Sequence, residues 1–136
     1  MLCVLGLLDA AYLTFEHYTA SSTLACADNG AINCLKVTTS TYSKALGVPV
    51  ALLGLLFFVA MTVLCLPQMW QSARPVVHRL RLAAVVLGML SVLYLLWAEL
   101  FKIDAICLFC TGVHVLTFAL FALVVVEATG AFAAPE

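Results

Sequence analysis

Charged residues are scarce in this chain, and the few that it has form no basic run. Only 10% of its 136 residues are charged and 65% are hydrophobic, whereas soluble domains carry about 25% charged residues. This scarcity excludes an ordinary water-soluble domain. The net charge of -1 and the missing basic run also argue against nucleic acid as a partner.

Strand-like alternation and internal repeats are missing as well, and no basic stretch precedes the first apolar segment. Backbone groups in lipid must be satisfied within helices or a closed barrel, so the missing alternation favours helices. The missing basic start argues against a secretory signal peptide. We therefore expect one compact domain of membrane helices over residues 1–136.

Four apolar segments are long enough, or nearly so, to cross a bilayer, which takes roughly 17–25 residues. They cover residues 1–17, 47–67, 80–101 and 106–128. The sequence thus predicts an all-α fold, an integral membrane four-helix bundle. A polar loop over residues 18–46 joins the first two segments. The turn at residues 102–105 is so short that the last two helices must be antiparallel neighbours.

The basic residues predict the orientation in the membrane. All three arginines fall within residues 74–81, and positive charge concentrated in a short loop marks the cytoplasmic side. With an even number of crossings, the loops at 18–46 and 102–105 share the outer face, where disulfides persist. Both termini are then cytoplasmic.

A Cys-x-x-Cys pair, Cys107 and Cys110, opens the last apolar segment. Such pairs are typical of redox chemistry or metal binding. A helix N-terminus lowers the pKa of a thiol through its partial positive charge and its free N–H groups. Cys26 and Cys34 lie in the polar loop on the same predicted face. Four thiols at one face of a membrane protein indicate electron transfer between a protein disulfide and something dissolved in lipid.

Two other interpretations of these cysteines stay open. A zinc site would use all four, but zinc sites favour closely spaced pairs and Cys26 and Cys34 are eight positions apart. Four incidental buried thiols fit poorly with the polar sequence around the loop cysteines. We predict no metal site. Cys3 and Cys65 have no obvious partner and are predicted to be small buried residues.

Two residues near Cys110 are candidates for binding. His114 follows it by four positions and shares its helical face. A polar residue inside a membrane helix is a functional candidate, here as a donor to a bound carbonyl; the alternative is a hydrogen bond to the backbone of a neighbouring helix. Phe109, adjacent to Cys110, is predicted to be a pocket wall.

The order of these residues resembles the vitamin K epoxide reductase family over almost the whole chain, and particularly its prokaryotic homologues. The matching elements are Cys26, Cys34, Ser40, Gly47-Val48-Pro49 entering a helix, the Cys107/Cys110 pair, and Gly6 with Ala11-Tyr12-Leu13-Thr14 in the first segment. The resemblance implies a four-helix bundle around a quinone of the ubiquinone, menaquinone or vitamin K type. It also implies that the outer loop carries a short helix capping the pocket.

The resemblance further implies an electron relay. Cys26 would exchange disulfides with a separate thioredoxin-like or DsbA-like dithiol protein, and Cys34 would pass electrons to Cys107. Cys110 would face the quinone. Ser40 and His114 would lie beside the quinone pocket. Thiol exchange of this kind is favoured at an activated, accessible thiolate.

The chain departs from the family pattern in two places. We expect no fused thioredoxin-like domain after the bundle, although many bacterial members have one, so a thioredoxin-like partner would be a separate protein. The animal enzymes place an asparagine four residues before a glycine on the second helix, but Val50 precedes Gly54 here. Quinone contacts on that helix, and activity on vitamin K epoxide, are therefore left unassigned.

The function predicted from the sequence is that of a quinone-dependent thiol–disulfide oxidoreductase of a prokaryotic plasma membrane, which supports disulfide formation in exported proteins. The alternatives are a vitamin K epoxide or quinone reductase of the same fold and a non-enzymatic membrane metal-binding protein. An unrelated bacterial quinone-linked oxidase is disfavoured, because it carries its Cys-x-x-Cys in the first external loop rather than the second.

Overall fold

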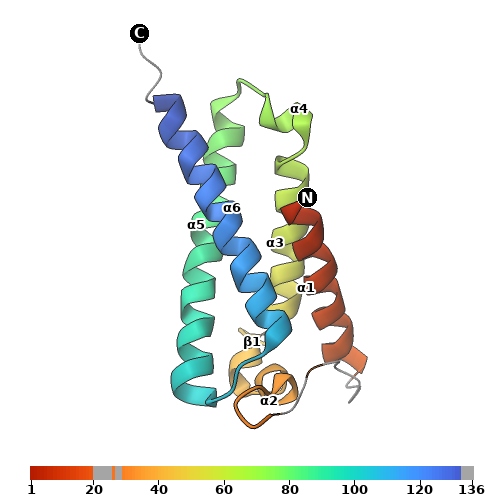
Figure 1. Cartoon of the computed structure of the whole chain (residues 1–136). Coiled ribbons are helices and arrows are strands. Elements are labelled where there is room, and N and C mark those ends of the chain that lie inside the picture. Colours follow the sequence, from red (N-terminus) through yellow and green to blue (C-terminus); the bar gives the residue numbers. More distant parts are fainter. Residues whose placement is uncertain (20–25, 27–28, 133–136) are drawn as a thin grey trace.

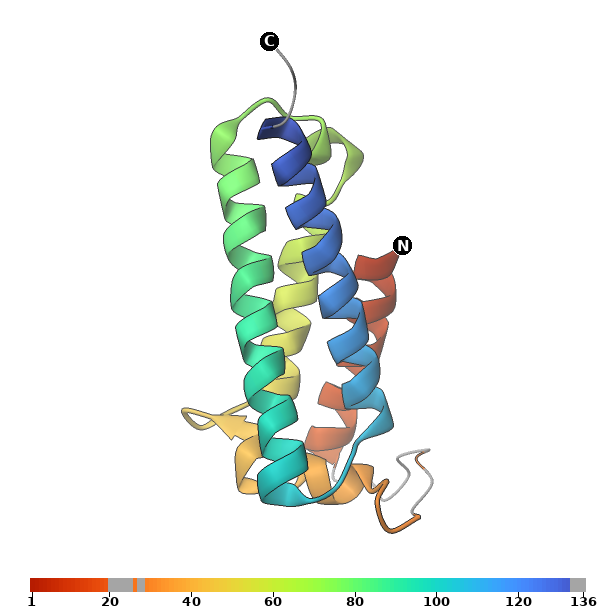
Figure 2. The ribbon, with the colours of Figure 1, turned by 60° about the vertical axis from the view of Figure 1, so that its left-hand side comes forward.

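Four long helices lie side by side and make up most of the molecule (Figures 1 and 2). The computed structural model describes residues 1–19, 26 and 29–132. The long helices are α1 (Leu2–Thr19), α3 (Val50–Leu64), α5 (Pro75–Ala98) and α6 (Leu108–Phe132). α1 packs on α3 and α6, and α5 packs on α6 and α3. The all-α prediction is confirmed, and each long helix coincides with one of the four apolar segments.

Short elements fill the connections. They are α2 (Cys34–Thr38), the 3-10 turn η1 (Thr41–Ser43), the antiparallel strands β1 (Lys44–Ala45) and β2 (Val48–Pro49), α4 (Pro67–Trp70) and the π-helical turn η2 (Glu99–Ile103). α2 is the short helix that the family resemblance implied for the outer loop. Its N-cap is Asn33, whose side chain accepts a hydrogen bond of 2.8 Å from the backbone N–H of Lys36. The hairpin, α4 and η2 have no counterpart in the predictions from sequence.

Proline and left-handed residues set several of these boundaries. α5 begins at Pro75, five residues before the predicted span, because proline is well suited to the first turn of a helix. α3 begins directly after Pro49. Leu46 and Gly47 have φ values of 53° and 84° at the tip of the β1–β2 hairpin. Positive φ at both central residues suits the twist of a two-residue hairpin turn.

Two buried clusters lie along the axis of the molecule. The larger lies among the four long helices and contains Cys3, Ala10, Phe58, Met61, Val85, Leu120 and Val124. Within it, Gly6 lets α1 approach α3, because a Cβ at Gly6 would overlap the ring of Phe58. The smaller cluster, which we call the cysteine cluster, contains Leu13, Cys34, Val37, Ile103, Ala105 and Cys107.

The outer surfaces of the long helices are apolar. The helical stretch Pro75–Ile103 and the stretch Leu108–Gly130 are long and apolar enough to cross a membrane, yet only 17% and 22% of their most apolar windows are buried inside the molecule. Apolar side chains that point away from the core fit a lipid surrounding. α3 is a shorter apolar helix. Among the described residues, two of the four predicted spans are therefore long and apolar enough to be membrane-crossing helices.

The two ends of the molecule differ (Figure 1). α2, the hairpin, η2 and the start of α6 gather at one end, which we call the cysteine end. α4 lies at the opposite end, beside the first turns of α5. The loop that carries Cys26 and Cys34 and the segment before Cys107 therefore share one end, as the count of crossings predicted.

Arg81 holds the opposite end together. It is 1% exposed, and it forms an ion pair of 3.1 Å with Glu127 of α6. It donates to the carbonyl oxygens of Leu64 and Met69 at 3.0 and 3.1 Å, and its guanidinium lies 4.1 Å from the ring centre of Trp70. One of the three arginines used to predict the orientation thus also joins α3, α4, α5 and α6.

Candidate redox site

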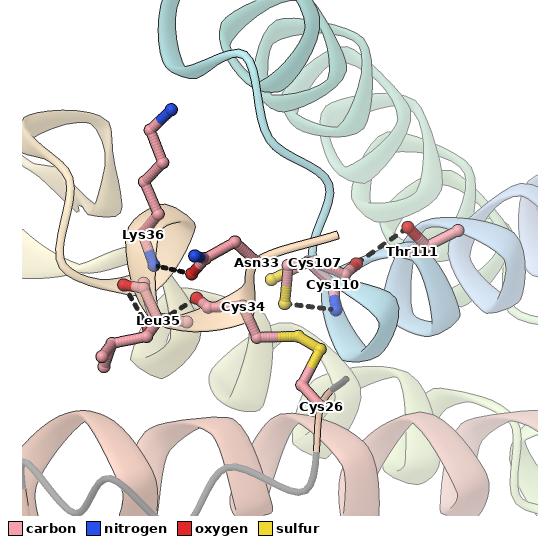
Figure 3. Close-up of a disulfide and its surroundings, with 9 residues drawn as sticks. Cys26, Asn33, Cys34, Leu35, Lys36, Cys107, Cys110 and Thr111 are labelled. Atoms are coloured by element: carbon pink, nitrogen blue, oxygen red, sulfur yellow. Dashed lines mark hydrogen bonds between the residues drawn. A yellow bond between two sulfur atoms is a disulfide. The ribbon is translucent and has the colours of Figure 1, made fainter. Parts of the chain in front are cut away.

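A disulfide joins Cys26 to Cys34, the first residue of α2 (Figure 3). The Cα atoms are 6.0 Å apart. Cys34 is buried, at 2% exposed, whereas Cys26 is half-buried. A partner from solution therefore meets the Cys26 sulfur more readily than the Cys34 sulfur.

Cys107 and Cys110 are free thiols at the start of α6. Cys107 is fully buried, and its Sγ accepts the backbone N–H of Cys110 at 3.3 Å. The carbonyl oxygen of Cys107 accepts the Thr111 N–H and hydroxyl at 2.9 and 2.8 Å. The neighbouring Cys110 thiol, and to a smaller extent this backbone N–H, lower the pKa of the Cys107 thiol below its ordinary value, although burial and the nearby carboxylate of Glu99 oppose the shift. Cys107 is therefore favoured as the thiolate of the pair.

A short parallel β-bridge brings the two cysteine pairs together. Ile32 pairs with Ile106, and the N–H of Asn33 donates to the Ile106 carbonyl at 3.0 Å. The N–H of Ile106 donates to Ala31 at 2.9 Å. Because Cys34 and Cys107 follow this bridge by one or two residues, both side chains enter the cysteine cluster. Cys26 and Cys110 pack against the same cluster.

α1 fixes the start of α6 on its other side. The ring of Phe109 lies 5.0 Å from that of Tyr12, centre to centre, so α1 already covers the predicted pocket wall in part. Asp9 reaches α6 at Gly112, where a Cβ would stand 2.7 Å from its Oδ2. The Oδ1 of Asp9 is buried without a hydrogen-bond partner in the described part of the chain.

The other two predicted binding residues, His114 and Ser40, differ in whether their polar side-chain atoms have a hydrogen-bond partner. His114 is 5% exposed, and its buried Nδ1 finds no partner among the described residues; for this nitrogen the backbone-bonded alternative has no support. Ser40 ends the α2 region, and its hydroxyl donates to the Val37 carbonyl at 2.8 Å. Its hydroxyl proton is therefore used within its own loop.

The comparison with protein families agrees with this arrangement. A family model described as the vitamin K epoxide reductase family matches residues 1–125. The chain belongs to that family. A search of curated proteins found no match. Membership makes this chain a membrane oxidoreductase, consistent with its apolar helices and its grouped cysteines.

Glu99, an acidic residue close to the cysteines, was not selected as a candidate from the sequence. Yet it is 4% exposed, and its carboxyl group lies beside the backbone N–H of Cys107. It also lines a cavity of about 330 Å³. A carboxylate inside an apolar segment is itself a functional signal, and that signal would have found both Glu99 and Asp9.

The remaining cysteines also differ from expectation. Cys3 is buried, as predicted, whereas Cys65 is only partly buried, and both are free thiols that lie close to each other. Both belong to the packing of the larger core cluster. The zinc alternative needs four thiolates, but Cys26 and Cys34 are joined in a disulfide, and zinc binds the thiolate form of cysteine.

Proposed function

We propose that this protein is a quinone-dependent thiol–disulfide oxidoreductase. It takes electrons from a separate, reduced thioredoxin-like protein and passes them through both cysteine pairs to a quinone in the membrane, which supports disulfide formation in exported proteins. The observation that carries the proposal is the shared burial of Cys34 and Cys107 in the cysteine cluster. One pair is oxidised and the other reduced, which is the state that the proposed internal exchange leaves behind.

The exposure of the sulfurs sets the direction of the first exchange. A thiolate of the partner attacks Cys26, which is the accessible sulfur, and Cys34 leaves as a thiolate. The second thiol of the partner then releases Cys26, so the partner becomes a disulfide. Two electrons and two protons have moved to the Cys26–Cys34 pair.

The second exchange takes place inside the cysteine cluster. It requires Cys107 and Cys110 to be joined as a disulfide, as they are after delivering their electrons. The Cys34 thiolate attacks Cys107, and Cys110 leaves and takes up a proton. Cys26 then attacks Cys34 and releases Cys107 as a thiolate, which its lowered pKa favours. The arrangement seen in the structure is restored.

The residues around Cys110 fit a quinone. A quinone bound there supplies a two-electron, two-proton acceptor. Its ring needs apolar walls and its carbonyls need hydrogen-bond donors. The partnerless Nδ1 of His114 is such a group in a buried place, one helical turn from Cys110. We assign His114 to a quinone carbonyl, Phe109 to a wall, and Ser40 to the edge nearest α2.

The orientation follows from the two ends. We propose that all four long helices cross a prokaryotic plasma membrane, with the cysteine end outside and both termini in the cytoplasm. The arginines of residues 74–81 support this, because they lie at the opposite end.

Quinone reduction by the purified protein tests the proposal. We expect a reduced thioredoxin-like protein and a quinone to react rapidly in its presence, followed by the absorbance of the quinone. Cys107→Ser and Cys110→Ser should each reduce the rate to that of the mixture without enzyme, because each breaks the inner pair. Cys65→Ser, outside both pairs, is the control and should retain the rate. Turnover that survives in both inner-pair variants contradicts the relay.

A further inference from the structure

Glu99 lies at a turn that folds back under Cys107. It is the first residue of η2, and its carbonyl oxygen accepts the Ala105 N–H at 3.3 Å. Asp104, with a φ of 52°, ends η2 in a left-handed conformation and reverses the chain. The reversal brings the carboxylate of Glu99 to the backbone N–H of Cys107, eight positions later in the sequence. The two residues are therefore neighbours in space, although Glu99 opens η2 and Cys107 precedes α6.

The same carboxylate borders a cavity at the surface. The cavity measures about 330 Å³ and is lined by Gly30, Ala31, Glu99, Leu100, Asp104, Ala105 and Ile106. Gly30, Ala31 and Asp104 are exposed, so water enters from the cysteine end. Cys107, in contrast, is fully buried. Glu99 thus lies between a buried thiol and a cavity that is open to solvent.

The chemistry of the inner pair requires such a connection. Reduction of the Cys107–Cys110 disulfide to two thiols takes up two electrons and two protons, and oxidation of the dithiol releases the same. The electrons arrive by thiol exchange from Cys34, but a thiolate carries no proton with it. A buried pair therefore needs a group that brings protons to it.

We propose that Glu99 exchanges protons between the Cys107–Cys110 pair and the water of the cavity. The inference rests on the proposed function. When Cys34 reduces the inner disulfide, protonated Glu99 gives its proton to the leaving thiolate and becomes a carboxylate. Water in the cavity then reprotonates it. Cys107 is released as a thiolate, so the reduced pair carries one proton, on Cys110. When the pair is oxidised, Glu99 supplies the second proton that a two-electron, two-proton acceptor takes up, and water of the cavity reprotonates it.

Few other charged side chains of the described residues lie near Glu99 and Cys107. Asp104 shares the cavity, and Asp9 approaches α6 from α1 at Gly112. The Nζ of Lys102 lies 5.3 Å from the ring centre of Trp97. In the described part of the chain, no lysine or arginine forms an ion pair with Glu99; the ion pair found there joins Arg81 to Glu127. Asp104 therefore provides a matched control, since it borders the cavity without contacting Cys107.

The test compares Glu99→Gln with Asp104→Asn in full-length protein lacking Cys3 and Cys65 through alanine substitutions. Glutamine keeps an oxygen that accepts the Cys107 N–H, and asparagine tolerates the left-handed backbone at position 104. The first measurement is the ultraviolet absorbance of the Cys107 thiolate against pH, assigned by subtracting the Cys107→Ser variant. It needs no quinone. The second is the rate of quinone reduction against pH.

We expect Glu99→Gln to lower the midpoint of the Cys107 titration, because the negative charge that opposes the thiolate is gone. Its turnover should fall by about 100-fold, the lower end of the usual effect of removing a proton-transferring group. Asp104→Asn should change neither the midpoint of the Cys107 titration nor the turnover. Should Glu99→Gln fail to fold, Glu99→Asp keeps the carboxylate and is expected to retain the pH profile at a reduced rate.

Each contrary result is distinct. Wild-type turnover in Glu99→Gln at every pH overturns the proton-exchange role, whatever the titration shows. An unchanged Cys107 midpoint overturns the contact on which that role rests. A wild-type protein that titrates as expected but never reduces a quinone overturns the proposed function alone, because the titration is read without quinone.

Discussion

At the scale of single residues, the chemistry depends on the unequal surroundings of two neighbouring thiols. Cys107 ends an extended segment and receives the Cys110 N–H, whereas Cys110 is already inside α6. The first thiol is therefore favoured as the thiolate of the pair, and the second packs against the cysteine cluster. Glu99 adds a carboxylate beside Cys107 from η2, and His114 adds an imidazole one helical turn after Cys110.

The lowered pKa of Cys107 makes the stability of the reduced protein depend on pH. A folded-state pKa below the unfolded value, about 8.5 for a free thiol, stabilises the fold above that value. The stabilisation is lost as the pH falls through the lowered pKa of the folded state. We expect the wild-type melting temperature, measured in detergent with both inner thiols reduced, to rise across this window relative to that of Cys107→Ser. Parallel curves for the two proteins would show that the thiol titrates normally.

At the scale of elements, the α1–α3 contact depends on the lack of a side chain at Gly6. We expect Gly6→Ala to destabilise the protein by about 1–3 kcal/mol, because the new methyl group overlaps the Phe58 ring. Gly54→Ala is the matched control, since a Cβ there meets nothing within 4 Å. It should stabilise helix α3 by about 0.5–1 kcal/mol. Denaturant titrations of both variants in detergent give the comparison, and equal effects of the same sign would contradict the close packing.

The long elements could be predicted from the sequence, and the short ones could not. Uninterrupted apolar runs indicate membrane helices whatever their neighbours are, so α1, α3, α5 and α6 appear where expected. The bridge between Ile32 and Ile106 depends on two segments more than 70 positions apart in the sequence. The turn at η2 likewise depends on how the chain reverses at Asp104. These contacts decide which side chains meet Cys107, and local sequence patterns do not encode them.

The same limit applies to the candidate site. The cysteines could be found because few other roles explain a Cys-x-x-Cys at a helix start with two loop cysteines at the same face. The contact of Glu99 with Cys107 could not, because eight positions of sequence separation do not reveal a chain reversal. Ser40 was selected by family resemblance alone, and its hydroxyl bonds its own loop.

At the scale of the whole molecule, the two ends differ in structure. The end with Arg81 is held by an ion pair and two hydrogen bonds to carbonyl oxygens, while the cysteine end carries the thiols, the hairpin and the cavity. A membrane between them would separate an anchored side from a reactive side. This arrangement agrees with electrons entering at the cysteine end and leaving within the bundle.

Labelling with a membrane-impermeant maleimide tests the orientation. Leu46 at the hairpin tip is fully exposed, and Arg79 is exposed at the opposite end. We expect Leu46→Cys to be labelled in intact cells, because the hairpin lies outside. Arg79→Cys should be labelled only after the membrane is opened, and the unsubstituted protein gives the background from its native thiols. Reversed labelling would contradict the proposed topology.

The proposed relay depends on the transfer of electrons between Cys34 and Cys107. Its most direct test is to trap a disulfide between these two residues. In the double variant Cys26→Ser/Cys110→Ser, each of the two sulfurs loses its resolving partner. We predict that mild oxidation joins Cys34 to Cys107 within one molecule, detected by mass spectrometry of the digested protein. The triple variant that also carries Cys107→Ser should lack this product. Free thiols at both positions, or only disulfides between molecules, would contradict the relay.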